Sequence, residues 1–468
     1  MNQQDYDQYY RDSPAARFSV LITICIGSFL TPLSLSATLV AIPAIAHDLQ
    51  ADARLVSWIP AAFLLSNLIT LLPAGRMADT HGRKRIFLIG SVIFVLGTLL
   101  AGLVTSIEAL LVFRVVQGVG AAMFFSTGMA IISSVFQDRG RGAALGWVVA
   151  SVYTGLTCGP LIGGWLTDQF GWHAVFFFQI PFALLGILLT LLKMKGEWRS
   201  ENPEPIDWLG AILLALCVLS FFSGVTLLPG WTAAGLLGGS VLLLILLVRH
   251  MDRVPAPLVR LKVVWNNRLF SHNLLASVLM YSGNYGLIFL LGLYLQYNHG
   301  MTPTEAGQML MLQAVVMAVL APMAGRLSDH FQARYLATAG CLSAAIAFAL
   351  FIYVDVTTPV YWIGMALMFL GAGFGLFSTP NNSAALGSIP HGRLGIGSAL
   401  LNMSRLTGQM LGTAVVAGLM SVYIGSNTIT PDRYSALSQV FDVAVVLSLG
   451  FALAAAWFSF VNVHKSSA

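Results

Sequence analysis

Charged side chains are scarce in this chain of 468 residues, because only 9% are Asp, Glu, Lys or Arg, whereas 57% are hydrophobic. A soluble globular domain carries roughly 25% charged residues. A chain so poor in charge is solvated mainly by lipid, so its organisation follows from its membrane spans. The net charge of +5 does not indicate a nucleic-acid-binding protein, because the basic residues flank apolar segments.

Cysteine is also scarce, and the sequence lacks the usual marks of catalytic chemistry. The four cysteines lie in apolar runs without a CxxC pair, which predicts buried small side chains and neither a disulfide framework nor a metal site. The phosphate-binding pattern G-x-x-x-x-G-K-[ST] is missing, and no linker is long enough for a soluble catalytic domain. We therefore expect no enzyme, no cofactor, no metal and no ATP-driven transport by this chain alone.

Apolar runs between charged or Pro/Gly-rich breaks predict 14 transmembrane helices. The predicted spans are 17–43, 54–75, 84–104, 108–135, 142–168, 172–194, 208–228, 231–250, 268–297, 303–325, 333–353, 357–380, 393–424 and 436–462. An even number of spans places both termini on one side of the membrane. The sequence therefore predicts an all-α polytopic membrane protein.

Basic residues are unevenly shared between the two sides of these spans. Of the 24 Lys and Arg, only Arg54 and Arg433 fall in loops on the side away from the termini, and only Arg114 and Arg405 fall within spans. Cytoplasmic loops carry the excess of Lys and Arg. The sequence therefore predicts a multi-pass protein of the bacterial inner membrane with both termini in the cytoplasm.

A short repeat indicates two related halves. The sequence Gly-Arg-Met-Ala-Asp at 75–79 ends the second span, and Gly-Arg-Leu-Ser-Asp at 325–329 ends the tenth. The offset predicts two six-helix bundles with two inserted helices between them, and transporters built in this way bind substrate near the midplane where the halves meet. The predicted segments are a cytoplasmic tail at 1–16, an N-terminal bundle at 17–195, a linker with two extra helices at 196–251, a C-terminal bundle at 252–463 and a tail at 464–468.

The densest group of charges lies at 75–85, between the second and third spans. Gly75 would let its helix approach a neighbour closely, and Gly82 would allow a tight turn. Asp79 can lie against the N-terminus of a helix in the other half, where the helix dipole favours an anion, and Arg83 could pair with Asp138. We predict a cytoplasmic gate made of Gly75, Arg76, Asp79, Gly82, Arg83, Asp138, Arg326 and Asp329. The alternative is a basic turn that only sets topology.

The fourth span carries Arg114 followed by Gln117 and a glycine. An arginine inside a span is costly and usually faces the bundle interior with a partner. We expect an organising polar network here, and the alternative is that Arg114 reaches the outer interface.

Glycines recur along the fifth span at positions that share a helix face. Spacings of four place Gly155, Gly159 and Gly163 together, so that a facing helix can pack backbone to backbone. Pro160 removes a helix hydrogen bond and bends the helix. We predict a hinge at the interface between the halves, made of Gly146, Gly155, Gly159, Pro160, Gly163 and Gly164. The alternative is ordinary packing of small residues.

These three segments resemble signatures of the major facilitator superfamily. The first is similar to G-x-L-A-D-x-x-G-R-[KR]-x, and the glycine-rich one matches the antiporter signature G-x8-G-x3-G-P-x2-G-G. The stretches that resemble the 14-helix drug:proton antiporter family within it are 38–58, 171–181, 294–307, 371–380 and 404–408. The resemblance implies a major facilitator fold and alternating-access, proton-driven efflux of amphipathic compounds, and hence multidrug efflux and antibiotic resistance.

One position departs from the family pattern. The first-span motif of the family has an acidic residue where this chain has Ser34, and Asp442 is the acidic residue placed furthest inside a span. Proton coupling needs a group that can load from one side and unload to the other. The predicted coupling residues are Arg114, Gln117, Asp442 and Arg405; the alternative for Asp442 is a solvated helix start.

Polar residues near the middle of the spans suggest the substrate layer. Neutral hydrogen-bonding groups among apolar walls suit an amphipathic ligand, although each could serve only interhelical hydrogen bonding. The candidates are Ser34, Asn67, Tyr153, Thr154, Tyr281, Asn284, Tyr285, Gln313 and Gln409. Arg114 and Arg405 are cationic, so the sequence does not exclude anionic or zwitterionic substrates.

The expected partners are a small organic substrate, protons and membrane lipid. We leave open a periplasmic adaptor and otherwise expect a monomer. A metabolite facilitator or symporter on the same scaffold is the alternative function. A membrane-embedded sensor or enzyme would need an extramembrane domain or a clustered His, Asp or Cys site, and the sequence contains neither.

Overall fold

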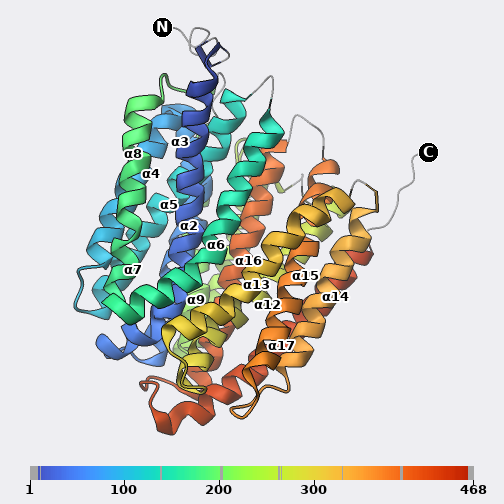
Figure 1. Ribbon diagram of the computed structural model, residues 1–468. Coiled ribbons are helices and arrows are strands. Elements are labelled where there is room, and N and C mark those ends of the chain that lie inside the picture. The colour runs from blue at the N-terminus through green and yellow to red at the C-terminus, as the bar shows by residue number, and fades with distance from the viewer. Residues whose placement is uncertain are drawn as a thin grey trace.

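The computed structural model describes residues 9–10, 12–136, 140–200, 204–261, 264, 266–328, 330–389 and 394–461. Fourteen helices in this part of the chain are long and apolar enough to cross a membrane, which confirms the predicted all-α fold (Figure 1). The first bundle contains α2 (Pro14–Asp48), α3 (Ala53–His81), α4 (Arg83–Ala101), α5 (Ile107–Val135), α6 (Arg141–Phe170), α7 (His173–Phe177) and α8 (Gln179–Lys193). The second contains α12 (Arg268–Tyr297), α13 (Pro303–Leu327), α14 (Ala333–Phe351), α15 (Val360–Gly387), α16 (Leu394–Tyr423) and α17 (Tyr434–Phe460), the last preceded by the short η2 (Pro431–Arg433). The inserted pair is α9 (Trp208–Thr226) and α10 (Trp231–Arg253).

Helix boundaries differ from the predicted ones where side chains cap the ends. The first span is longer than predicted because the Ser13 hydroxyl accepts a hydrogen bond from the backbone N–H of Ala16 and so starts α2. The predicted span 172–194 is built from two pieces, α7 and α8, which meet at Phe178. These differences leave the number and order of the spans unchanged.

Each bundle packs around its own central helices. In the first bundle α2 packs on α6, and α5 packs between α3 and α4. In the second bundle α12 packs on α16 and α17, while α15 packs on α13 and α14. The two bundles meet mainly along α6 with α13 and along α3 with α16. Figure 1 shows them side by side, blue to green for the first and yellow to red for the second.

Of the two inserted helices, α9 lies against the seam formed by α3 and α16, and α10 packs on α9. The Trp58 and Phe222 rings pack edge to face with centroids 4.7 Å apart, which joins α3 to α9. The Ser421 hydroxyl of α16 lies 2.7 Å from the carbonyl oxygen of Thr226. Asp207 accepts a hydrogen bond of 2.8 Å from the N–H of Gly210 and pairs with His250 at 2.7 Å, so one carboxylate caps α9 and holds α10.

The two faces of the molecule are distinguished by the chain termini. The terminal face contains the start of α2 and the α3–α4 turn at 81–83, and it lies toward the top of Figure 1. The opposite face contains the α2–α3 turn at 49–52 and the first turn of α13. The helices run between these faces, so a contact can be assigned to one face or the other from its position along a helix.

Candidate functional site

The α3–α4 turn holds its charges within itself. Gly82 has φ +111°, a conformation that L residues other than glycine rarely adopt. Arg83 donates to the Asp79 carboxylate at 2.9 Å and to the Ser134 hydroxyl of α5 at 2.7 Å. The structure therefore pairs Asp79 with Arg83, which lies four residues away across the turn. We had expected Asp79 to lie against the N-terminus of a helix in the other half. Asp138, the expected partner of Arg83, and Asp329 lie outside the described residues.

A segment that sequence reasoning missed supports this turn. The Glu197 carboxylate accepts hydrogen bonds from the backbone N–H of Lys84 at 2.8 Å and of Arg85 at 3.2 Å, at the N-terminus of α4. A negative charge is favourable there because the helix dipole and the free N–H groups point at it. A Cβ on Gly82 would lie 2.4 Å from the carboxyl carbon of Glu197, so the glycine also makes room for this carboxylate. The only sequence signal was a lone acid within the basic segment 193–199.

The other predicted gate residues have different surroundings. Arg76 forms an ion pair of 2.5 Å with Glu204, which also contacts Arg260, so the linker bridges the end of α3. Arg326 is exposed at the end of α13. The expectation of a close helix approach at Gly75 was wrong, because a Cβ there would have no atom within 4 Å. Close contacts between the halves lie elsewhere.

The glycine face of α6 packs against its own bundle, which corrects the predicted interface. A Cβ on Gly155 would lie 2.4 Å from the Phe29 carbonyl oxygen, and one on Gly163 would lie 2.5 Å from that of Ala37, both in α2. Gly159 likewise faces Ser36 of α2. These positions share one face because they are four residues apart, and that face points at α2.

The neighbouring positions of α6 make the contact with the other bundle. A Cβ on Gly164 would lie 2.2 Å from the Pro303 carbonyl oxygen of α13, and one on Gly307 would lie 2.2 Å from the carbonyl oxygen of Pro160. Toward the terminal face, a Cβ on Gly146 would have no atom within 4 Å. The close α6–α13 packing is therefore concentrated at the opposite face.

Polar contacts close the same face. Asp168, at the end of α6, accepts a hydrogen bond of 2.9 Å from the N–H of Thr304 in the first turn of α13. The Gln296 side chain donates to the Val40 carbonyl at 2.9 Å, and the backbone N–H of Ala53 donates to the Asn427 carbonyl at 3.0 Å. Sequence reasoning missed Asp168, which places an anion at a helix N-terminus of the other half, the arrangement we had expected for Asp79.

Arg114 lies fully buried in α5 and is surrounded by neutral groups. Its guanidinium donates to the Gln117 side-chain oxygen at 2.6 Å, to the Ser34 hydroxyl at 3.3 Å and to the Ile59 carbonyl at 3.3 Å. Gln117 in turn donates to the Thr98 hydroxyl at 2.8 Å. The expected polar network is present. It is closed in the interior, so Arg114 does not reach the outer interface.

Arg405 is the second arginine within a span. It donates to the Asn402 side chain at 2.7 Å, and its guanidinium lies over the Phe125 ring of α5, 5.6 Å from the centroid. This contact joins the two bundles. Among the described residues, neither Arg114 nor Arg405 belongs to an ion pair.

Some of the predicted substrate residues contact a polar or aromatic side chain of another helix, and others do not. Gln313 donates to Asn284 at 2.6 Å within the second bundle, and Tyr153 of α6 bonds Ser378 of α15 at 2.9 Å across the two bundles. Tyr281 packs edge to face on Phe374. Thr154 is exposed and bonds its own helix.

The remaining candidates lie in the interior. Asn67 is buried in α3, and Tyr285 is buried in α12. Gln409 is half-buried and its backbone carbonyl accepts from Thr413. Asn67 belongs to the first bundle and Tyr285 and Gln409 to the second, and their grouping with the Asn284–Gln313 pair into one substrate layer stays a prediction.

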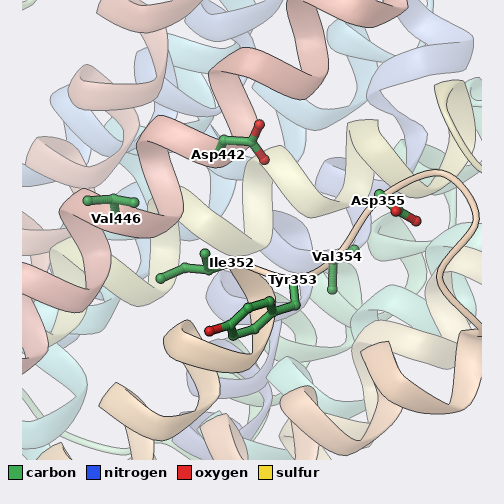
Figure 2. Close-up of a pocket in the computed structure, with 6 residues that line it drawn as sticks. All are labelled: Ile352, Tyr353, Val354, Asp355, Asp442 and Val446. Carbon is green, nitrogen blue, oxygen red and sulfur yellow. The ribbon is translucent and has the colours of Figure 1, made fainter.

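Asp442 is exposed on α17, a helix that packs on α12, α14 and α16 of its own bundle. Figure 2 shows it beside a cavity of about 470 Å³ that Asp355 and Tyr353 also line. Hydrogen bonds from Thr357 and Thr358 hold the pKa of Asp355 below its ordinary value. Asp442 lies eight residues after the first residue of α17, and both interpretations of it, a coupling residue and a solvated helix start, stay predictions.

Comparison with known proteins gives consistent results over most of the chain. The family model of the Major Facilitator Superfamily matches residues 24–413. The riboflavin transporter RibZ of Clostridioides difficile is 29% identical over 85% of this chain and 87% of its own. The drug efflux pump JefA of Mycobacterium tuberculosis is 28% identical over 93% of this chain and 87% of its own. The tetracenomycin C resistance and export protein of Streptomyces glaucescens is 27% identical over 89% and 78%.

Solved structures share the fold. A bacterial homolog to the human lysosomal transporter Spinster, in an inward-facing and unoccupied conformation, superimposes with a TM-score of 0.69 at 20% identity. The match covers 96% of this chain and 97% of that one. The occupied inward-facing conformation of that homolog gives a TM-score of 0.68 at 19% identity.

Proposed function

Because this chain belongs to the major facilitator superfamily, we propose that it is a secondary active transporter that exports small amphipathic organic compounds in exchange for protons. The transport cycle is alternating access, in which the two bundles close one face of the molecule while the other face opens. The chain is a multi-pass membrane protein, and we place it in the bacterial inner membrane with the terminal face toward the cytoplasm.

The unequal packing of the two faces carries this proposal. At the opposite face, Gly164 meets Pro303 and Asp168 meets Thr304, so backbone lies on backbone across the bundles. Toward the terminal face, Gly146 of the same helix α6 meets open space. A contact that is tight at one end and loose at the other is what a rocking motion needs, since packed interfaces switch between discrete arrangements.

The gate at the terminal face is built to change partners. Asp79 and Arg83 pair within the turn here, and both side chains keep partial exposure. An ion pair at the surface is worth about 0–1 kcal/mol, so it can be exchanged for a contact with the other bundle at little cost. The predicted role of the 75–85 segment as a gate therefore stays part of the proposal.

The proposed substrate class rests on the relatives and on the predicted substrate layer, and the proposed proton drive rests on the antiporter signature at 146–164. JefA is named a drug efflux pump and RibZ a riboflavin transporter, so we propose an organic compound with both aromatic and polar parts. Asn284, Gln313 and Tyr153 supply neutral hydrogen-bonding groups between the bundles. Because the layer lacks a described carboxylate, a metabolite facilitator is the second candidate.

Transport into proteoliposomes tests the proposal. Protein oriented with its terminal face outward should accumulate riboflavin against a gradient when the lumen is acidic, and collapsing the pH gradient should stop this accumulation. Asp79→Ala is the matched control: it should insert normally and lose most of the flux.

Three results separate the candidates. Accumulation that depends on the pH gradient supports antiport. Equilibration without accumulation supports the facilitator. Undiminished uphill transport after the gradient is collapsed excludes proton drive.

A further inference from the structure

We propose that Arg114 and Tyr285 form an anion-binding site where the two bundles meet. The site takes either the anionic group of the transported compound, a carboxylate above all, or a small inorganic anion such as chloride. The substrate part of this inference rests on the proposed transport function, whereas the binding of an anion does not.

The hydrogen bonds of Arg114 leave one side of its guanidinium unpaired. A guanidinium has five N–H donors. The Nε and Nη1 atoms donate to Ile59, Ser34 and Gln117, but Nη2 has no hydrogen-bond partner although it is buried. Buried polar groups are normally hydrogen-bonded, so this pair of donors marks a position that a ligand can fill.

The charge of Arg114 is also unbalanced. The side chain is 0% exposed, and its partners are an amide, a hydroxyl, a backbone carbonyl and the Phe63 ring 4.6 Å from its Cζ atom. None of the ion pairs in the described part of the chain includes it. A buried cation without a counter-charge is unfavourable.

The second half of the site comes from the other bundle. Tyr285 of α12 is 6% exposed, and its hydroxyl, like Nη2 of Arg114, is buried without a hydrogen-bond partner. Helix α12 runs beside α2, because a Cβ on Gly292 would lie 3.5 Å from the Leu39 carbonyl oxygen. Tyr285 precedes Gly292 by about two turns, and Ser34, which accepts a hydrogen bond from Arg114, precedes Leu39 by about one and a half turns. The two unpaired donor groups therefore lie at the same depth, beside α2, on helices of different bundles.

These groups select an anion over other ligands. Arginine has no acceptor atom, so a ligand group that only donates hydrogen bonds would find no partner on it. A cationic ligand would be repelled by its charge. A neutral acceptor could take the hydrogen bonds but would leave the charge unbalanced. An anion accepts from both Nη2 and the Tyr285 hydroxyl and neutralises the guanidinium, and such charge-assisted hydrogen bonds are the strong ones.

Binding at this position would also join the two bundles. Arg114 belongs to the first and Tyr285 to the second, so a shared anion would hold them together near the closed opposite face. The ligand would enter while the bundles move, because the guanidinium is enclosed in this conformation.

Anion binding can be measured on the purified full-length protein without a transport assay. The thermal midpoint is recorded as sodium chloride or sodium benzoate is added to a low-salt buffer, and the same additions to the Ser34→Asp variant correct for ionic strength. The wild type should be stabilised saturably by chloride, by benzoate or by both. Tyr285→Phe should weaken the apparent affinity about tenfold, the effect of losing one hydrogen bond to a charged group.

A carboxylate placed beside Arg114 gives the sharper variant. Ser34→Asp supplies an internal counter-charge, so this variant should unfold at a higher temperature than Ser34→Asn and lose the response to added anions. Ser34→Asn has the same shape without the charge and should keep the response. Both variants retain Arg114, so they remain informative even if Arg114→Gln fails to fold.

The outcomes distinguish the sources of the anion. Stabilisation by benzoate that Ser34→Asp abolishes assigns the site to an organic carboxylate. Stabilisation by chloride alone, abolished in the same way, assigns it to an inorganic anion. A wild type that does not respond, or equal responses in Ser34→Asp and Ser34→Asn, would overturn the site even if the transport assay succeeds.

Discussion

Single carboxylates at helix N-termini hold several connections of this molecule. Glu197 accepts from the first N–H groups of α4, Asp168 from the first turn of α13 and Asp207 from the first turn of α9. Each anion meets N–H groups that have no partner within the helix, and each is worth about 0.3–1 kcal/mol at an exposed site. Two of the three connect segments that are far apart in sequence.

Among the single residues of the α3–α4 turn, we expect Gly82 to tolerate substitution least. Gly82→Ala introduces a Cβ 2.4 Å from the Glu197 carboxyl carbon at a φ of +111°, so we expect a loss of about 1–3 kcal/mol in stability. Thermal unfolding of the purified variant measures this loss.

Gly75→Ala is the matched control, because nothing lies within 4 Å of its Cβ. Alanine is the better helix former by about 1 kcal/mol, so this variant should be as stable as the wild type or more so. Equal losses at Gly75 and Gly82 would contradict the role of the turn.

Helix α6 is the element on which the two bundles depend. Its face at Gly155, Gly159 and Gly163 fits α2, and its face at Pro160 and Gly164 fits α13. Adjacent residues on a helix point about 100° apart, so one glycine-rich helix can pack closely on two neighbours at once. The first face stabilises the packing within one bundle, and the second makes the contact between the two bundles.

Two neighbouring substitutions separate these roles. Gly163→Ala should lower the thermal midpoint, because its Cβ meets the Ala37 backbone within one bundle. Gly164→Ala should instead open the opposite face, because its Cβ meets Pro303 of the other bundle. Distances between spin labels at Gln169 and Gln308, measured by pulsed electron resonance, report that opening. Identical effects of both variants on these distances would refute the assignment of the two faces.

At the scale of the whole molecule, the two faces differ in the contacts that hold them. The opposite face combines backbone contacts with hydrogen bonds between the bundles, whereas the α3–α4 turn at the terminal face pairs its charges within the turn and with the linker. The inserted helix α9 adds contacts to both α3 and α16. In the proposed alternating access, one face would open while each bundle keeps its own packing.

Orientation in the membrane is a property of the whole chain. In a variant without the four native cysteines, a membrane-impermeant maleimide added to intact cells should label Gln50→Cys and not His81→Cys. Both positions are exposed, in turns at the opposite and terminal faces respectively. Labelling of His81→Cys from outside would place the gate turn on the wrong side and overturn the proposed direction of transport.

Local properties of the sequence determined the number of spans, their order and the position of the glycine-rich helix, because hydrophobic length and spacing along one helix need no knowledge of neighbours. Only the tertiary structure decided which neighbour each face meets. It turned Gly163 toward α2 and Gly164 toward α13, paired Asp79 with Arg83, brought Glu197 to the α3–α4 turn and placed Asp442 away from the interior. These outcomes depend on how helices distant in sequence are rotated and packed against one another. The pattern of residues along one sequence determines neither the rotation nor the packing.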